Sequence, residues 1–140
     1  MTIREQNLDT ISPVLVSFGI HQTAGVDDLK DANIGEAVTI TGNNEVGPAG
    51  DGDMVLGKLV KLSLSDIDTG KRVASVQVTG TCRLAISAPY PTVGDRIVGA
   101  ATGTVKQAPA LASSDPAGGN VARGIVLAVN DTTDCIVLLD

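Results

Sequence analysis

The sequence predicts an all-β protein: a small β-sandwich or barrel of short antiparallel strands, with long Gly/Pro-rich loops and an extended N-terminal arm. Short apolar runs recur at close spacing, and glycine and proline residues separate them. No segment carries the apolar period of a framework helix. Because 140 residues suffice for one domain, we expect an N-terminal arm or edge strand at 1–20 and a single all-β domain at 21–140.

The clearest element is a closing hairpin. Two runs of β-branched and aliphatic residues, 125–129 and 135–139, flank the turn-forming stretch 130–134. Neither run alternates apolar with polar residues, which predicts strands covered on both faces. One chain of this size does not readily supply both covers, so the hairpin indicates a protein that packs on other proteins.

The remaining elements follow from local signals. Extended, apolar or alternating stretches predict strands at 34–41, 54–65, 72–79 and 81–87, the middle two joined by a turn at 66–70. Two prolines, Pro89 and Pro91, end the last of these. A compact hairpin is expected over 93–107, with strands at 96–99 and 104–107. Local helical character is confined to 24–32, and surface loops are expected at 42–53 and 108–119.

The N-terminal segment contains the candidate contact residues. Pro13 disfavours helical geometry at its predecessor and precedes the extended apolar run 14–18. Two placements are open: an ordinary first strand of the domain, or an arm laid on a neighbouring subunit. In the second case the partner contacts would be made by Ile11, Val14, Leu15, Val16 and Phe18.

Composition restricts the function. Phe18 and Tyr90 are the only aromatic residues, so Val, Ile, Leu and Ala must build the core, which suits a small barrel or sandwich better than a ligand cavity. The net charge of −6 and the scattered basic residues argue against a nucleic-acid partner. No stretch approaches the roughly 18 apolar residues of a membrane span, and the polar start lacks a signal-peptide core, so we expect cytoplasmic synthesis.

Residues suited to catalysis or metal binding are few. His21 is the only histidine, and no Gly-x-Ser-x-Gly motif surrounds a serine. Asp51 and Asp53 slightly resemble a calcium loop, but the spacing does not fit an EF-hand. Cys82 and Cys135 each lie in an apolar run and are expected to be buried, reduced thiols. We therefore expect no catalytic residue, cofactor or metal, and no enzymatic activity.

One enzyme family offers an alternative. The segment Ala24-Gly25-Val26-Asp27, with Leu29, resembles the first motif of the dUTPases, small all-β trimers that hydrolyse a nucleotide. Their substrate-binding strand and their glycine-rich, aromatic C-terminal arm have no counterpart in this sequence. The resemblance leaves a dUTPase-like nucleotide hydrolase as the alternative function.

A broader resemblance covers residues 34–140. The succession IGEAVTITG, GKLVKLSL, RVASVQVTGTCRLAIS, VGDRIVGAATGTVKQ and VARGIVLAVNDTTDCIVLLD resembles the head decoration, or cement, proteins of tailed bacteriophages. The family tends to show a Val-x-Val-x-Gly strand, a Gly-Asp-x-Val turn and strand, and a closing hairpin. Here these correspond to Val76 to Thr81, Gly94 to Val98 and Gly124 to Leu138. This sequence departs from the family in its longer polar N-terminal lead and its few aromatics.

The resemblance implies a structural virion protein. Such proteins bind the outer capsid surface, bridge neighbouring capsid subunits and commonly assemble as oligomers, often trimers. It therefore implies two partners, the major capsid protein and further copies of this chain, as a homotrimer or a dimer, with no nucleic acid or membrane. The expected location is the virion, after assembly in the host cytoplasm. A tail or baseplate β module is a related alternative.

Overall fold

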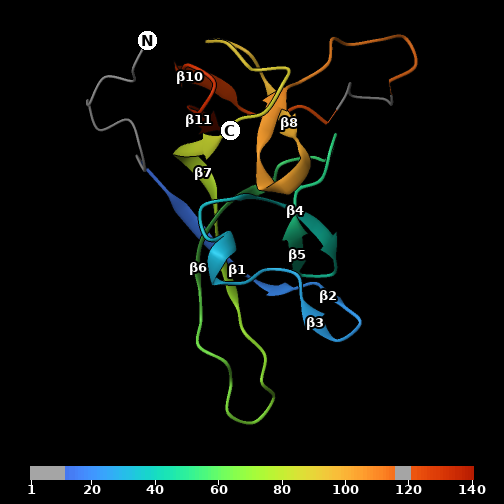
Figure 1. Ribbon diagram of the computed structural model, residues 1–140, viewed down its shortest axis with the longest axis vertical. Helices are drawn as coiled ribbons and strands as arrows, with labels where there is room; N and C mark the ends of the chain where they lie inside the picture. The colour runs from blue at the N-terminus through green and yellow to red at the C-terminus, as the bar shows by residue number, and fades with distance from the viewer. Residues whose placement is uncertain (1–11, 116–120) are drawn as a thin grey trace.

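The computed structural model describes residues 12–115 and 121–140, which are almost entirely β (Figure 1). This confirms the predicted all-β class. The strands are β1 (Val14–Ile20), β2 (Gln22–Thr23), β3 (Val26–Asp27), β4 (Ala37–Gly42), β5 (Glu45–Pro48), β6 (Gly57–Leu62), β7 (Ala74–Ala85), β8 (Ile97–Gly99), β9 (Val105–Gln107), β10 (Ile125–Asn130) and β11 (Asp134–Leu139). Two short 3-10 turns, η1 (Asp31–Asn33) and η2 (Ala101–Gly103), complete the described elements.

Five strands of the main sheet close into a barrel. The sheet runs β1-β5-β4-β6-β7-β11-β10, and an additional pairing joins β1 back to β7. The ring β1-β5-β4-β6-β7 is therefore complete, which decides between the barrel and the sandwich that the sequence left open. All pairings in the ring are antiparallel except β1 with β5.

Strand β7 is shared by the barrel and the closing hairpin. Its first half pairs with β1 and β6, so that Val76 lies opposite Val16 on one side and Leu59 on the other. Its second half pairs with β11 as far as Ala85. Two strands divided at Gly80 were expected here. Gly80 instead adopts a positive φ of 88° and stays in the ladder opposite Leu139, so the chain continues as one strand.

Two local expectations are wrong. The stretch 42–53 was expected to be a loop, but it contains β5, because Val46 is fully buried and pairs with both Ile20 and Ile40. The helical character expected at 24–32 is limited to the start of η1. Gly25, with φ of 80°, instead forms a tight turn between β2 and β3.

The core consists of aliphatic side chains in two clusters, as the composition predicts. One fills the barrel, and Phe18 packs at its margin; its buried members are Ile20, Leu29, Val38, Val46, Leu59, Leu62, Ala74 and Val76. The other lies between the barrel, the closing hairpin and β8–β9; its buried members are Ala37, Ala49, Val55, Cys82, Leu84, Ile86, Ile97, Val105, Val126, Cys135, Val137 and Leu139.

Both predicted C-terminal hairpins are present. Strands β8 and β9 pair as expected, and β10 pairs with β11. The expected covering of both faces holds for most of β11, where Leu138 alone is exposed. The chain itself does not supply both covers for β10, which exposes Ile125 and Leu127. The chain thus buries one strand of the hairpin and leaves part of the other uncovered.

The Arg123 side chain fastens this hairpin to the barrel. Its guanidinium group donates hydrogen bonds to main-chain oxygens of Val55 and Leu56 before β6, of Val78 within β7 and of Asp140 after β11. Burial lowers the pKa of Arg123, and the nearby charge of Asp140 opposes that shift. The Arg123 side chain therefore supplies hydrogen-bond donors to main-chain oxygens from three separate segments of the chain.

The close approach of β6 to β7 generates a stability prediction. A Cβ atom at Gly57 would lie 1.9 Å from the carbonyl oxygen of Gln77, so Gly57→Ala must displace the barrel backbone. We expect a loss of about 1–3 kcal/mol in the free energy of unfolding, measured by denaturant titration. Gly19→Ala is the control, because its nearest contact, 3.4 Å, is ordinary. Equal stability of the two variants would contradict this packing.

Candidate protein-interaction surface

The structure places most of the predicted contact residues on one exposed strand. Val14, Leu15 and Val16 of β1 have exposed fractions of 51%, 52% and 38%. Phe18 is partly buried and packs against the barrel core. Ile11 lies outside the described residues. The exposed apolar surface is therefore formed by the first half of β1.

This strand belongs to the chain's own barrel. Residues 14–18 pair with β7, and Gly19 and Ile20 pair with β5. Within residues 1–20, where the sequence predicts an arm or edge strand, β1 is thus a strand of the barrel. Its Ile20 side chain is part of the barrel core, and its backbone pairs with β7. Since β5 begins opposite Gly19, residues 14–18 have β7 as their only strand partner in the described sheet, and form an edge there.

An apolar groove lies beside this edge. Its volume is about 300 Å³, and Lys58 is its only charged lining residue; the lining consists of Pro13, Leu15, Ile34, Gly35, Lys58, Leu59, Val60 and Gln77. The Gln77 side chain is 1% exposed, and its amide nitrogen donates to the carbonyls of Thr79 and Thr81. Because the Gln77 amide nitrogen is already hydrogen-bonded within the chain, the groove offers mainly apolar contacts to a partner.

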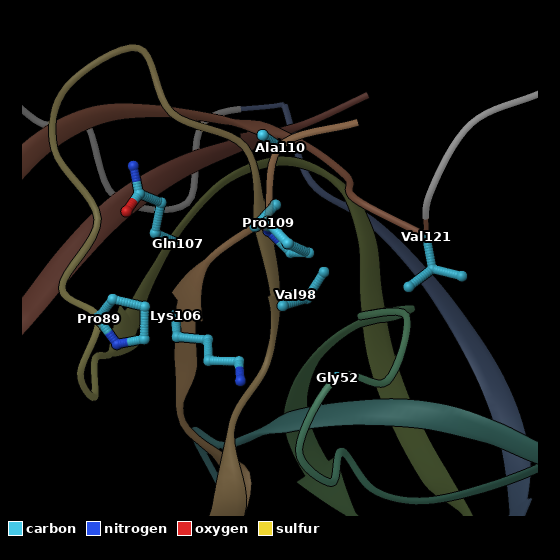
Figure 2. Close-up of a pocket in the computed structure, with 9 residues that line it drawn as sticks. Gly52, Pro89, Val98, Lys106, Gln107, Pro109, Ala110 and Val121 are labelled. Atoms are coloured by element: carbon cyan, nitrogen blue, oxygen red, sulfur yellow. The ribbon is translucent and has the colours of Figure 1, made fainter. Parts of the chain in front are cut away.

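A second apolar depression lies at the loop-rich end of the molecule (Figure 2). Its volume is about 430 Å³, and its walls come from β8, β9 and the neighbouring loops; the lining consists of Gly52, Pro89, Val98, Lys106, Gln107, Ala108, Pro109, Ala110 and Val121. The Lys106 ammonium is held 2.6 Å from the Asp51 carboxylate. Tyr90 and Leu111, each next to a lining residue in sequence, are exposed, as is Val93 in the loop that follows Pro89. We call these residues and the depression the loop-rich surface.

A polar pocket of about 390 Å³ lies beside β2 and β3. Nδ1 of His21 lies 2.6 Å from the Asp28 carboxylate, which also accepts from the Thr23 hydroxyl. The hydrogen bond to Asp28 raises the pKa of His21, and the same bond lowers the pKa of Asp28. The dUTPase-like segment forms this hairpin, but its Leu29 is fully buried.

No metal-binding cluster of three His, Cys, Asp or Glu residues occurs in the described parts of the chain. The Asp53 carboxylate accepts a hydrogen bond from the amide of Gly50 and so stabilises the loop itself. The Asp51 carboxylate pairs with Lys106 and so connects this loop to β9. As predicted, Cys82 and Cys135 are buried and no disulfide joins them. They lie on the adjacent strands β7 and β11. Burial raises the pKa of Cys135 to about 12, which keeps it a thiol.

Comparison with protein-family models, curated proteins and solved structures finds no match for this chain. Within residues 12–115 and 121–140, no helix is long and apolar enough to cross a membrane. The interaction surfaces are consequently interpreted from their own geometry. The sequence predicts the β1 surface from its apolar run and a contact at a loop-rich end, but it does not predict the groove or the residues that form the loop-rich surface. Their residues come from separate segments, and only folding brings them together.

The His21–Asp28 pair generates a pH prediction. Because the pKa of His21 is raised above 6.5, the pair stabilises the fold below that pH and weakens as pH rises through the raised value. At the acid end it is lost as pH falls through the pKa of Asp28, below 3.8. We expect NMR titration of His21 to give a midpoint above 6.5 in the native chain, and a lower one in Asp28→Asn.

Asp27→Asn is the matched control for this titration, because Asp27 bonds to Gln22 and not to His21. It should leave the His21 midpoint close to that of the native chain. Equal midpoints in the native chain and Asp28→Asn would contradict the pairing.

Proposed function

We propose that this chain is a structural virion protein that binds the outer surface of a phage capsid and stabilises it by bridging neighbouring capsid subunits. It acts as a homo-oligomer, with the major capsid protein as its partner. The resemblance of residues 34–140 to head decoration proteins gives the proposal its direction. Its main structural support is the exposure of two apolar surfaces, on β1 and at the loop-rich end.

These surfaces have the character of protein contacts. Leu111 is 72% exposed and directly follows Ala110, which lines a depression with few polar groups. Val93 is 66% exposed and belongs to the loop that follows the lining residue Pro89. Contiguous exposed apolar surface marks interaction sites, since an unoccupied surface of this kind promotes aggregation. The loop-rich surface is therefore the better candidate for the capsid contact, and β1 provides a second contact surface.

Oligomerisation strengthens such binding. Each apolar contact of this size is modest, but an oligomer that engages several capsid subunits binds its second and third sites at a high effective concentration. A protein that bridges subunits resists their separation, which is how a decoration protein stabilises a shell. The rigid barrel holds the contact residues at fixed positions and so limits the entropy lost on binding.

Co-sedimentation with capsid shells tests this function. The probe is the expanded, empty shell of the phage or prophage whose genome encodes the chain. We expect saturable binding by the native chain, and at least tenfold weaker binding by Val93→Asp/Leu111→Asp, because a buried carboxylate without a partner opposes docking. Ile67→Asp is the control, since Ile67 is fully exposed on the distant 63–73 loop (Figure 1). Absence of native-chain binding refutes the proposal.

The dUTPase-like alternative requires a ligand rather than a shell. The polar pocket with His21, Asp27, Lys71 and Arg72 is the place where it would act. A nucleotide present at about 100 times its dissociation constant would stabilise the fold by roughly 2.7 kcal/mol. Under our proposal, dUTP and the common nucleoside triphosphates leave the thermal unfolding midpoint unchanged. Clear stabilisation by one of them, with its hydrolysis, would favour the enzyme.

A further inference from the structure

The exposed part of β1 carries unpaired backbone groups as well as apolar side chains. The amides of Gly19 and His21 donate to the carbonyls of Asn44 and Val46, so at these positions the backbone faces β5. Backbone groups alternate in direction along a strand. The N–H and C=O groups of Leu15 and Ser17 therefore face the same side, away from β7, where β5 has not yet begun.

This edge lacks the usual protection against pairing. Proteins normally block an open edge with charged side chains, prolines or bulges. From Ser12 to Ile20 the chain carries no charge, and Pro13 stands only at its beginning. The one bulge of the β1–β7 ladder lies between Val14 and Leu15, at the start of the strand. The open edge is therefore suited to receive another strand.

We propose that the edge of β1 pairs with β1 of a second copy of this chain, antiparallel about a two-fold axis through Val16. In that register Leu15 lies opposite the partner's Ser17, and each such pair exchanges both N–H···O=C bonds. All outward-facing groups of Leu15 and Ser17 are then satisfied. A register centred on Leu15 would place Ser17 opposite Pro13, which has no N–H to donate, so it satisfies fewer groups.

The side chains fit the same register. Val16 meets its own copy on the axis, and partly buried Phe18 lies opposite exposed Val14, an aromatic and β-branched pair of the kind that stabilises sheets. The uncharged strand also brings the copies together without a like-charge contact, despite the net charge of −6. This pairing leaves the loop-rich surface free, and it does not depend on the capsid function.

Cysteine cross-linking tests the register on the full chain. In Val16→Cys the two new cysteines lie directly opposite, with Cα atoms about 4.5 Å apart, within disulfide range. We expect rapid formation of a covalent dimer under copper–phenanthroline oxidation. Ser17→Cys is the matched control, because its two copies are diagonal, about 7–8 Å apart, and cross-link poorly. The native cysteines are buried and do not compete.

Light scattering over a range of concentrations tests the association itself. The native chain and Ser17→Ala should form a dimer, and Ser17→Pro should be a monomer with unchanged circular dichroism, because it removes an N–H that no bond inside the chain uses. A monomeric native chain, a trimer, or a dimer indifferent to Ser17→Pro would overturn the proposal. Dimerisation that occurs only after removal of residues 2–11 would also overturn the proposal. None of these outcomes bears on shell binding by the loop-rich surface.

Discussion

The two-sided pairing of β7 is the constraint on which the rest of the structure depends. Over its first half, alternate backbone groups bond to β1 on one side and β6 on the other, and this closes the barrel. Over its second half it carries β11, and through β11 the edge strand β10. A single twelve-residue strand therefore fixes the barrel, the closing hairpin and their relative position. The placement of β1, and hence of its exposed edge, follows from the same ladder.

The side chains that stabilise this arrangement are small, and this has consequences for the surface. A core of Val, Ile, Leu and Ala packs a narrow barrel and leaves little internal space for a ligand. Several large apolar side chains are exposed at the surface, on β1, on β10 and at the loop-rich end. The buried polar groups, by contrast, are bonded: Gln77 to two carbonyls, and Arg123 to several. The chain thus satisfies its interior polar groups and leaves apolar surface available for partners.

The candidate surfaces differ in how far the sequence predicts them. The β1 surface comes from one continuous segment, so the sequence predicts its residues directly. The groove joins Leu15 to Ile34 and Val60, and the loop-rich surface joins Pro89 to Pro109 and Val121. No periodicity links such distant positions, because their proximity is created by strand pairing. His21 shows the same limit, since its partner Asp28 is set by the β2–β3 turn rather than by a motif.

The sequence by itself determined the all-β class, the two C-terminal hairpins and an aliphatic core, because turn residues and β-branched runs act locally on the backbone. It did not determine that 74–85 forms one strand, that β5 lies within a glycine-rich stretch, or that the sheet closes into a barrel. Those depend on long-range partners: Leu139 keeps Gly80 in the ladder, and Ile20 and Ile40 bury Val46. Only the tertiary structure decided where β5 begins relative to β1, and therefore which backbone groups remain unpaired.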